Sequence, residues 1–136
     1  MTFQIWTDGA SRGNPGKSGV GGIIKNHKGL VIDEVSEYVG IQTNNYAEYK
    51  ALEITLKRAL ELNIRSVDVF MDSKLVVEQL NGNWKVLSPT IKVLYGEIIL
   101  LTNKFESITF THILRHLNKE ADLLANKAID LYEIEN

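Results

Sequence analysis

Near the N-terminus the chain reads Thr2-Phe3-Gln4-Ile5-Trp6-Thr7-Asp8-Gly9-Ala10. Phe3 and Ile5 fall on one face of an extended segment, and Gln4, Trp6 and Asp8 fall on the other. This two-residue period is typical of a β-strand. The stretch therefore predicts a strand over residues 2–8 that presents a carboxylate where the apolar segment meets a polar turn.

Three further acids occupy the same kind of position, each beside a turn or a helix start. They are Glu48 in Thr43-Asn44-Asn45-Tyr46-Ala47-Glu48, Asp72 in Phe70-Met71-Asp72-Ser73, and Asp122 in Asn118-Lys119-Glu120-Ala121-Asp122. A compact fold can bring all four acids to one edge, where carboxylates repel one another unless a divalent cation holds them. Oxygen-only ligands favour Mg²⁺ or Mn²⁺, and paired ions of this kind cleave phosphodiesters. The four acids therefore indicate a metal-dependent nuclease.

Each acid, taken alone, also has a structural interpretation. Asp8 with Gly9 is compatible with a simple turn, and Glu48 stands three residues after Asn45, as in a reciprocal helix cap. Asp72 and Asp122 lie near helix starts, where the macrodipole favours an acid. The neighbouring residues favour the metal site when the four acids are considered together.

The rest of the chain alternates between strand and helix patterns. Asn26-His27-Lys28-Gly29 is a hairpin signature, Ser73 and Asn118 are suited to cap helices, and Pro89 suits a first helical turn. The predicted strands are residues 2–8, 19–26, 30–38, 67–71 and 108–114, and the predicted helices are residues 44–62, 73–81, 89–103 and 118–132. The order βββαβααβα predicts an α/β fold with a mixed five-stranded sheet flanked by helices.

Length and composition predict one soluble domain spanning residues 1–136, with 44% apolar and 24% charged residues. The absence of cysteine excludes disulfides and thiolate metal sites. The net charge is −2, of which the four acids contribute −4, so the rest of the chain carries +2 and charge does not decide the question of nucleic-acid binding. Since no segment resembles a signal peptide or a membrane span, we expect a cytoplasmic monomer.

Gly16-Lys17-Ser18 suggests a nucleotide-binding P-loop, but two features oppose this reading. The motif requires glycine five residues before Gly16, where this chain has Ser11. It also requires a helix directly afterwards, whereas residues 19–24 are strand-like. The glycines instead favour close approach of the backbone to a sugar or a phosphate.

Two other polar segments are typical of nucleic-acid contact. Thr43, Asn44 and Asn45 offer short donors at a helix N-terminus, which suits a phosphate, although they also suit a simple helix cap. Trp84 and Lys85 pair an aromatic ring with a cation, which suits base or sugar stacking beside a phosphate, although tryptophan is more often part of a core.

Taken together, these motifs resemble those of type 1 ribonuclease H. The matching segments run in family order from residue 7 to residue 125: Thr7-Asp8-Gly9-Ala10, Gly13-Asn14-Pro15-Gly16, Thr43-Asn44-Asn45 leading to Glu48, Asp72-Ser73, Trp84-Lys85, and Asn118-Lys119-Glu120-Ala121-Asp122-Leu123-Leu124-Ala125. The resemblance implies the ribonuclease H fold and hydrolysis of the RNA strand of an RNA–DNA hybrid, leaving 5′-phosphate and 3′-hydroxyl ends.

The resemblance also implies roles for individual residues. Asp8, Glu48, Asp72 and Asp122 would hold two Mg²⁺ or Mn²⁺ ions. The segment from Gly9 to Asn14 would read the RNA 2′-hydroxyl, while Thr43, Asn44 and Trp84 would hold the DNA strand. The substrate contacts expected in full are Gly9, Ala10, Ser11, Arg12, Asn14, Thr43, Asn44, Asn45, Ser73, Trp84, Lys85 and Asn118.

The chain departs from the family pattern in two places. Many members carry a basic helix after the tryptophan region, but here Ser88-Pro89-Thr90 starts the next helix almost at once. Many also place a mobile histidine loop before the last acid, whereas only Arg115-His116-Leu117 precedes Asn118. We expect Arg115 to replace that histidine at the cleaved phosphate, with His116 as the second candidate. Short relatives with wider substrate ranges add double-stranded RNA to the expected substrates.

Two other functions compete with hybrid cleavage. The first is a non-catalytic binder of RNA or hybrid on the same fold, which four intact acids oppose. The second is a different nuclease on this fold, such as a resolvase or an exonuclease. Gly13-Asn14-Pro15-Gly16 and Thr43-Asn44-Asn45 favour hybrid cleavage over that alternative, because they suit recognition of RNA on one strand.

Overall fold

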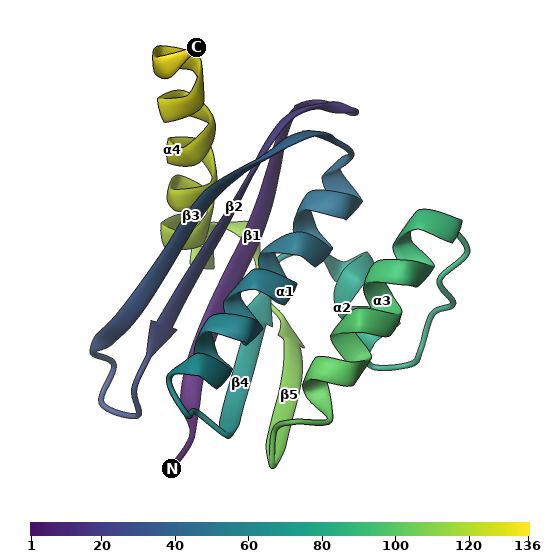
Figure 1. The fold of residues 1–136 in the computed structure, drawn as a ribbon. Helices are drawn as coiled ribbons and strands as arrows, with labels where there is room; N and C mark the ends of the chain where they lie inside the picture. Colours follow the sequence, from purple (N-terminus) through teal and green to yellow (C-terminus); the bar gives the residue numbers. More distant parts are fainter.

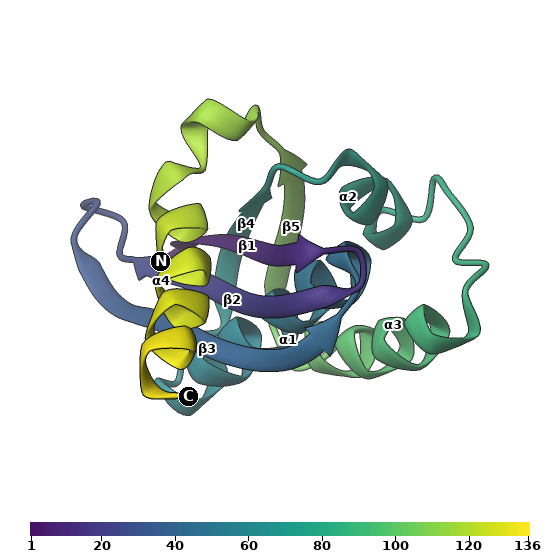
Figure 2. The same ribbon diagram turned by 90° about the horizontal axis from the view of Figure 1, so that it is seen from above.

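A computed structural model describes residues 1–136, which form one mixed sheet covered by helices on both faces (Figures 1 and 2). The strand order is β3-β2-β1-β4-β5. The elements are β1 (Phe3–Gly13), β2 (Gly16–Lys25), β3 (Val31–Gln42), α1 (Asn44–Glu61), β4 (Ser66–Met71), α2 (Lys74–Leu80), α3 (Pro89–Thr102), β5 (Ser107–His112), a short 3₁₀ helix (Arg115–Leu117) and α4 (Lys119–Glu135). The predicted order βββαβααβα and the mixed five-stranded sheet are confirmed.

The sheet separates two layers of helices (Figure 1). Neighbouring glycines of β2 show the two faces: a Cβ on Gly21 would meet Ala121 of α4, and one on Gly22 would meet Thr55 of α1. The α1 side holds the main core, in which Ile5, the alternating residues of β4 and the apolar faces of α1, α2 and α3 pack together. None of the helices combines the length and the apolar content that a membrane span requires.

Strand β1 is longer than the sequence pattern predicted, and this extension shapes the site. It continues through Asp8 to Gly13, paired antiparallel with β2 from Gln4 to Gly13. The interpretation of Asp8 and Gly9 as a turn is therefore wrong, because the chain reverses only at Asn14-Pro15. The parallel neighbour β4 pairs with β1 only from Phe3 to Trp6. Beyond Trp6 one edge of β1 has no strand beside it.

Short polar residues cap three of the four α-helices, of which the sequence suggested Thr43 and Ser73 and the structure adds Ser88. The side chains of Thr43, Ser73 and Ser88 each accept a hydrogen bond from a backbone amide in the first turn of α1, α2 and α3, respectively. The prediction for α4 is wrong in detail, because the side chain of Asn118 makes no capping bond. Strand β5 also ends at His112 rather than at residue 114, which places Arg115 in the 3₁₀ helix.

Two glycine substitutions should change stability in opposite directions, because Gly21 lies against α4 whereas Gly96 borders open space. A Cβ at position 21 would lie 2.0 Å from the carbonyl oxygen of Ala121, so α4 must move away in Gly21→Ala. We expect a loss of about 2 kcal/mol or more in the free energy of unfolding. Gly96 lies within α3 and a Cβ there meets open space, so Gly96→Ala should gain about 0.5–1 kcal/mol from the reduced freedom of the unfolded chain.

Urea unfolding monitored by circular dichroism measures both effects on the same scale. Equal stability of the Gly21→Ala variant and the parent protein would mean that α4 does not pack against β2 in solution.

Candidate active site

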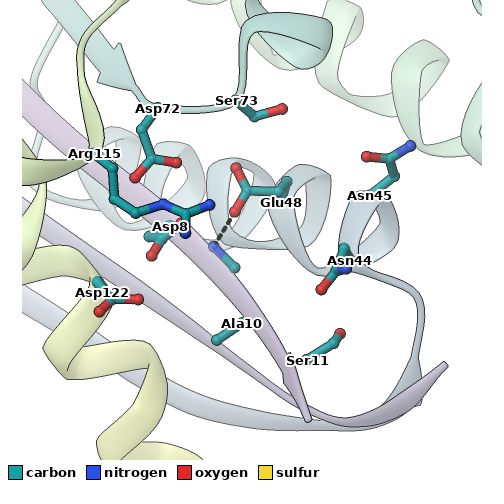
Figure 3. A pocket seen from close by; sticks show the side chains of 11 residues that line it. Asp8, Ala10, Ser11, Asn44, Asn45, Glu48, Asp72, Ser73, Arg115 and Asp122 are labelled. Atoms are coloured by element: carbon teal, nitrogen blue, oxygen red, sulfur yellow. Dashed lines mark hydrogen bonds between the residues drawn. The ribbon is translucent and has the colours of Figure 1, made fainter. Parts of the chain in front are cut away.

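An open pocket of about 350 Å³ lies where β4 ends beside the continuing strand β1 (Figure 3). Ala10 is its only hydrophobic lining residue. The lining residues are Asp8, Gly9, Ala10, Ser11, Asn44, Asn45, Glu48, Asp72, Ser73, Arg115 and Asp122. All of these were singled out from the sequence, so distant parts of the chain meet at the position that the motifs predicted.

Each of the four acids enters this pocket from a different element (Figure 3). Asp8 lies within β1 and Glu48 within α1, while Asp72 follows β4 directly and Asp122 lies in the first turn of α4. Carboxylate oxygens of Asp8, Glu48 and Asp72 all lie within 4.8 Å of one another. Oxygen ligands at this spacing suit a divalent cation such as Mg²⁺.

Glu48 is fixed by the backbone of β1. One of its carboxylate oxygens, Oε1, accepts a hydrogen bond of 2.6 Å from the amide of Gly9. Glycine is required at this position, because a Cβ would lie only 2.3 Å from the carbonyl carbon of Ala47 in α1. The capping interpretation of Glu48 is wrong, since Thr43 caps α1 and Glu48 bonds across to β1 instead.

The second oxygen of Glu48, Oε2, is buried and has no hydrogen-bond partner among the protein atoms. Buried polar atoms are nearly always paired, so an unpaired carboxylate oxygen points to a missing partner. The residues that share the pocket with Glu48 include Asp8 and Asp72, which are acceptors when ionised. A bound cation would satisfy this oxygen and neutralise its neighbours, so the donor set fits a divalent metal.

The metal-free pocket favours protonated carboxyl groups. Burial, followed by the charge of the adjacent Glu48, raises the pKa of Asp8 above its usual range. Burial also raises the pKa of Glu48, although the bond from Gly9 opposes the shift. The pKa of Asp72 is raised by burial and is lowered in part by Asn118 and Arg115. A bound cation would reverse this preference by stabilising the ionised forms.

Arg115 is the cation that lines the pocket, and its side chain reaches over Asp8 beside Asp72 (Figure 3). It makes no ion pair within 4.0 Å and no side-chain hydrogen bond, so an arginine merely held at the end of a strand by a salt bridge is excluded. His116 does not line the acid pocket. It lies in a neighbouring depression together with Leu114, Arg115, Lys119 and Asp122.

Two predicted substrate residues of the β1–β2 hairpin point elsewhere. Arg12 lies outside the pocket, because its guanidinium pairs with Asp130 at 2.6 Å and with Glu133 at 2.5 Å on α4. Asn14 also lies outside it, and its side-chain oxygen accepts a 3.0 Å hydrogen bond from the amide of Asn44. Both residues therefore fix the hairpin to helices in this structure.

Asn118 supports the pocket without lining it. Its buried side-chain amide donates to the carbonyl oxygen of Thr7 at 2.9 Å and lies 3.4 Å from the carboxylate of Asp72. Asn126, which sequence reasoning missed, donates from the next turn of α4 to the carboxylate of Asp122 at 3.2 Å. The four-residue spacing between Asp122 and Asn126 on a helix is the signal that identifies such a contact.

Thr43, Trp84 and Lys85 are the remaining predicted contacts, and none of them lines the acid pocket. Thr43 caps α1. Trp84 and Lys85 line a separate depression. The ring centroid of Trp84 lies 5.9 Å from the ammonium group of Lys74. The aromatic side chain is 45% exposed, so it is available for stacking and is not a core residue.

The raised pKa of Asp8 predicts how metal-free stability changes with pH. An acid whose folded pKa exceeds its unfolded value favours folding below the unfolded pKa, and that advantage is lost as pH rises toward the folded pKa. In chelator, wild type should therefore lose stability relative to Asp8→Asn between about pH 5 and about pH 8, by up to about 1.4 kcal/mol per pH unit.

Thermal unfolding of both proteins across this pH range measures the difference. Added Mn²⁺ should stabilise wild type but should stabilise Asp8→Asn much less. Asp68→Asn is the control and should be stabilised like wild type, because the carboxylate of Asp68 lies outside the pocket and accepts a hydrogen bond from Thr109. A pH-independent difference would show that Asp8 ionises as freely in the fold as in the unfolded chain.

Comparison with known proteins places the chain in a family. Residues 6–128 match the family model described as "Reverse transcriptase-like". The chain is 42% identical over 132 residues to the bifunctional protein Rv2228c of Mycobacterium tuberculosis, covering 96% of this chain but only 36% of that protein. It is 33% identical to the ribonuclease H of Chlorobium phaeobacteroides, covering 92% of this chain and 93% of the relative.

Solved structures agree in fold. RNase H1 from the archaeon Halobacterium salinarum superposes with a TM-score of 0.93 at 35% identity, covering 96% of this chain and 98% of that chain. LC11-RNase H1, isolated from compost and solved in complex with an RNA/DNA hybrid, has a TM-score of 0.91 at 40% identity, covering 96% and 98% of the two chains. By sequence and by structure, this chain belongs to the ribonuclease H family of nucleases.

Proposed function

We propose that this protein is an endonuclease that hydrolyses the RNA strand of RNA–DNA hybrids and leaves 5′-phosphate and 3′-hydroxyl ends. The observation that carries the proposal is the meeting of Asp8, Glu48 and Asp72 within 4.8 Å in an open, polar pocket. Membership in the ribonuclease H family supports it, as does the hybrid bound to LC11-RNase H1.

The four acids would hold two Mg²⁺ or Mn²⁺ ions. When bound, such ions activate a water molecule and stabilise the leaving 3′ oxygen during in-line displacement. The chain supplies the oxygen donors and their orientation: Gly9 fixes Glu48, Asn118 contacts Asp72, and Asn126 contacts Asp122. The unpaired Oε2 of Glu48 is the donor atom left free for this purpose.

Recognition of the RNA strand would fall to the part of β1 that borders the acids. Gly9, Ala10 and Ser11 line the pocket next to Asp8, so backbone groups and one hydroxyl lie near the reacting phosphodiester. Short polar groups of this kind suit the 2′-hydroxyl that distinguishes RNA from DNA. Asn44 and Asn45 line the same pocket at the N-terminus of α1, where a phosphate is favoured.

Arg115 would contact the phosphate that is cleaved. Its guanidinium is unpaired in the protein and reaches over the acids, and a guanidinium binds two phosphate oxygens at once (Figure 3). Charge that develops on those oxygens would be stabilised by this contact. This role is the one that a histidine loop serves in many family members.

The metal assignment predicts the effect of removing one acid. Asp72→Asn should abolish cleavage of a labelled RNA–DNA hybrid in Mg²⁺ or Mn²⁺, because the site loses a charged ligand while the core is unchanged. Asp68→Asn, in the strand β4 that Asp72 follows directly, is the matched control and should cleave at the rate of wild type, since Asp68 lies outside the pocket. Cleavage by Asp72→Asn within about tenfold of wild type, or about 1.4 kcal/mol of barrier, would refute the assignment.

The same assay separates the competing functions. Double-stranded RNA and double-stranded DNA are tested beside the hybrid, with each metal. Binding of the hybrid without cleavage would favour the non-catalytic binder, and equal cleavage of hybrid and DNA would favour a general nuclease. We expect the hybrid to be cut under conditions that leave the DNA duplex intact.

Arg115→Ala should lower the single-turnover rate of hybrid cleavage at least about tenfold, because losing a donor to a developing oxyanion typically costs about 10²–10³ in rate. His116→Ala should have a smaller effect, since His116 lies outside the acid pocket. Arg65→Ala is the control, because Arg65 bonds only backbone carbonyls before β4. If Arg115→Ala cleaved at the wild-type rate, Arg115 would be a surface residue that takes no part in cleavage.

A further inference from the structure

Gln79 connects the buried core to the segment that carries Trp84 and Lys85. It lies in the last turn of α2 and is only 7% exposed. Its side-chain oxygen accepts a 2.5 Å hydrogen bond from the hydroxyl of Tyr49, and its side-chain nitrogen donates to the carbonyl oxygen of Lys85 at 3.2 Å. The orientation of the amide is fixed, because a carbonyl oxygen can only accept.

Residues 85–87 have only one hydrogen bond to hold them, beside the packing of Val86 against the main core. They lie between α2 and α3 in irregular structure, and the bond from Gln79 is the only hydrogen bond made by any of the three. The preceding residue is held differently, since the amide of Trp84 donates to the carbonyl oxygen of Glu78 at 3.2 Å. Leu87 is 78% exposed, so apolar packing does not replace the missing bonds there.

Gln79 also lies where two surface depressions meet. One depression contains Asn45, which lines the acid pocket as well, together with Gln79 and Lys85. The other contains Gln79 and Lys85 together with Trp84. The three depressions therefore share lining residues in sequence: Asn45 belongs to the acid pocket and the middle depression, and Gln79 and Lys85 belong to the middle depression and the one beside Trp84.

We propose that Gln79 is a positioning residue that holds the Trp84–Lys85 segment at a fixed distance from the acid pocket, and so sets the affinity for the strand of the duplex that is not cleaved. The inference rests on the proposed function. Tyr49 follows Glu48 on α1, so the chain of bonds from Tyr49 through Gln79 to Lys85 ties the segment to the helix that carries one of the acids.

Tyr49 is a reliable anchor for this chain of bonds. It is fully buried in the main core, and its hydroxyl donates the 2.5 Å hydrogen bond to Gln79 from there. A simpler role for Gln79 would be to satisfy this buried hydroxyl and nothing more. That role concerns stability alone, and paired substitutions separate it from positioning.

Three variants make this separation. Gln79→Met removes both bonds and leaves the hydroxyl of Tyr49 unpaired, which costs stability. The double variant Tyr49→Phe with Gln79→Met removes both polar partners from the core, which restores stability in large part but not the bond to Lys85. Tyr49→Phe alone keeps the bond to Lys85. Gln42→Met is the matched control, because the Gln42 amide also donates to a backbone carbonyl, that of Val39.

Three measurements are made on each protein. Hydrogen exchange reports the amide of Trp84, which borders the segment and is bonded to the carbonyl oxygen of Glu78. Titration of a defined RNA–DNA hybrid in chelator reports the dissociation constant without cleavage, and a single-turnover assay reports the rate of cleavage. We expect faster exchange and a dissociation constant raised about three- to tenfold in Gln79→Met and in the double variant, the range for one lost hydrogen bond. The single-turnover rate at saturating hybrid should stay within about twofold, since the acids are untouched.

The outcomes are distinguishable. If the double variant regains stability and also binds hybrid like wild type, Gln79 serves the core alone and the inference is overturned. Unchanged exchange of the Trp84 amide in Gln79→Met overturns it as well. If wild type itself does not bind the hybrid, the proposed function fails, while the exchange measurement still decides whether Gln79 holds the segment.

Discussion

The contact between the amide of Gly9 and the carboxylate of Glu48 fixes the geometry on which the rest of the site depends. It holds the first turns of α1 against the middle of β1 at 2.6 Å, an approach that only glycine allows. With one oxygen of Glu48 bound to the sheet, the other must face Asp8 and Asp72. The helix that packs on the sheet therefore also determines where the carboxylates meet.

This arrangement is unfavourable for the fold by itself. Asp8 and Glu48 are each only 6% exposed, and like charges at this distance cannot all ionise without a counter-ion. A large core beneath the α1 face, which includes Ile5 and Leu52, supplies the stability that this crowding opposes. Stability and activity thus make opposite demands on the same residues, and a bound cation would reconcile them.

Local patterns in the sequence were sufficient to predict the order of elements and the four acids, and the resemblance to ribonuclease H added the other residues that line the pocket. Thr43, Ser73 and the alternation in β4 are short-range signals, and the structure follows them. The errors concern long-range pairing. The continuation of β1 past Asp8 depends on β2, and the side chain of Asn118 bonds Thr7, which is 111 residues away, instead of capping its own helix. No local pattern contains such information.

The packing of α4 has a consequence for the synthesis of the chain. Asp8, Glu48 and Asp72 lie in the first part of the sequence, but Asp122 reaches the pocket only when α4 docks on the glycine-bearing face of β2. A chain still emerging from the ribosome therefore has three of the four carboxylates and an uncovered sheet. The proposed site is therefore complete only once α4 has docked on β2.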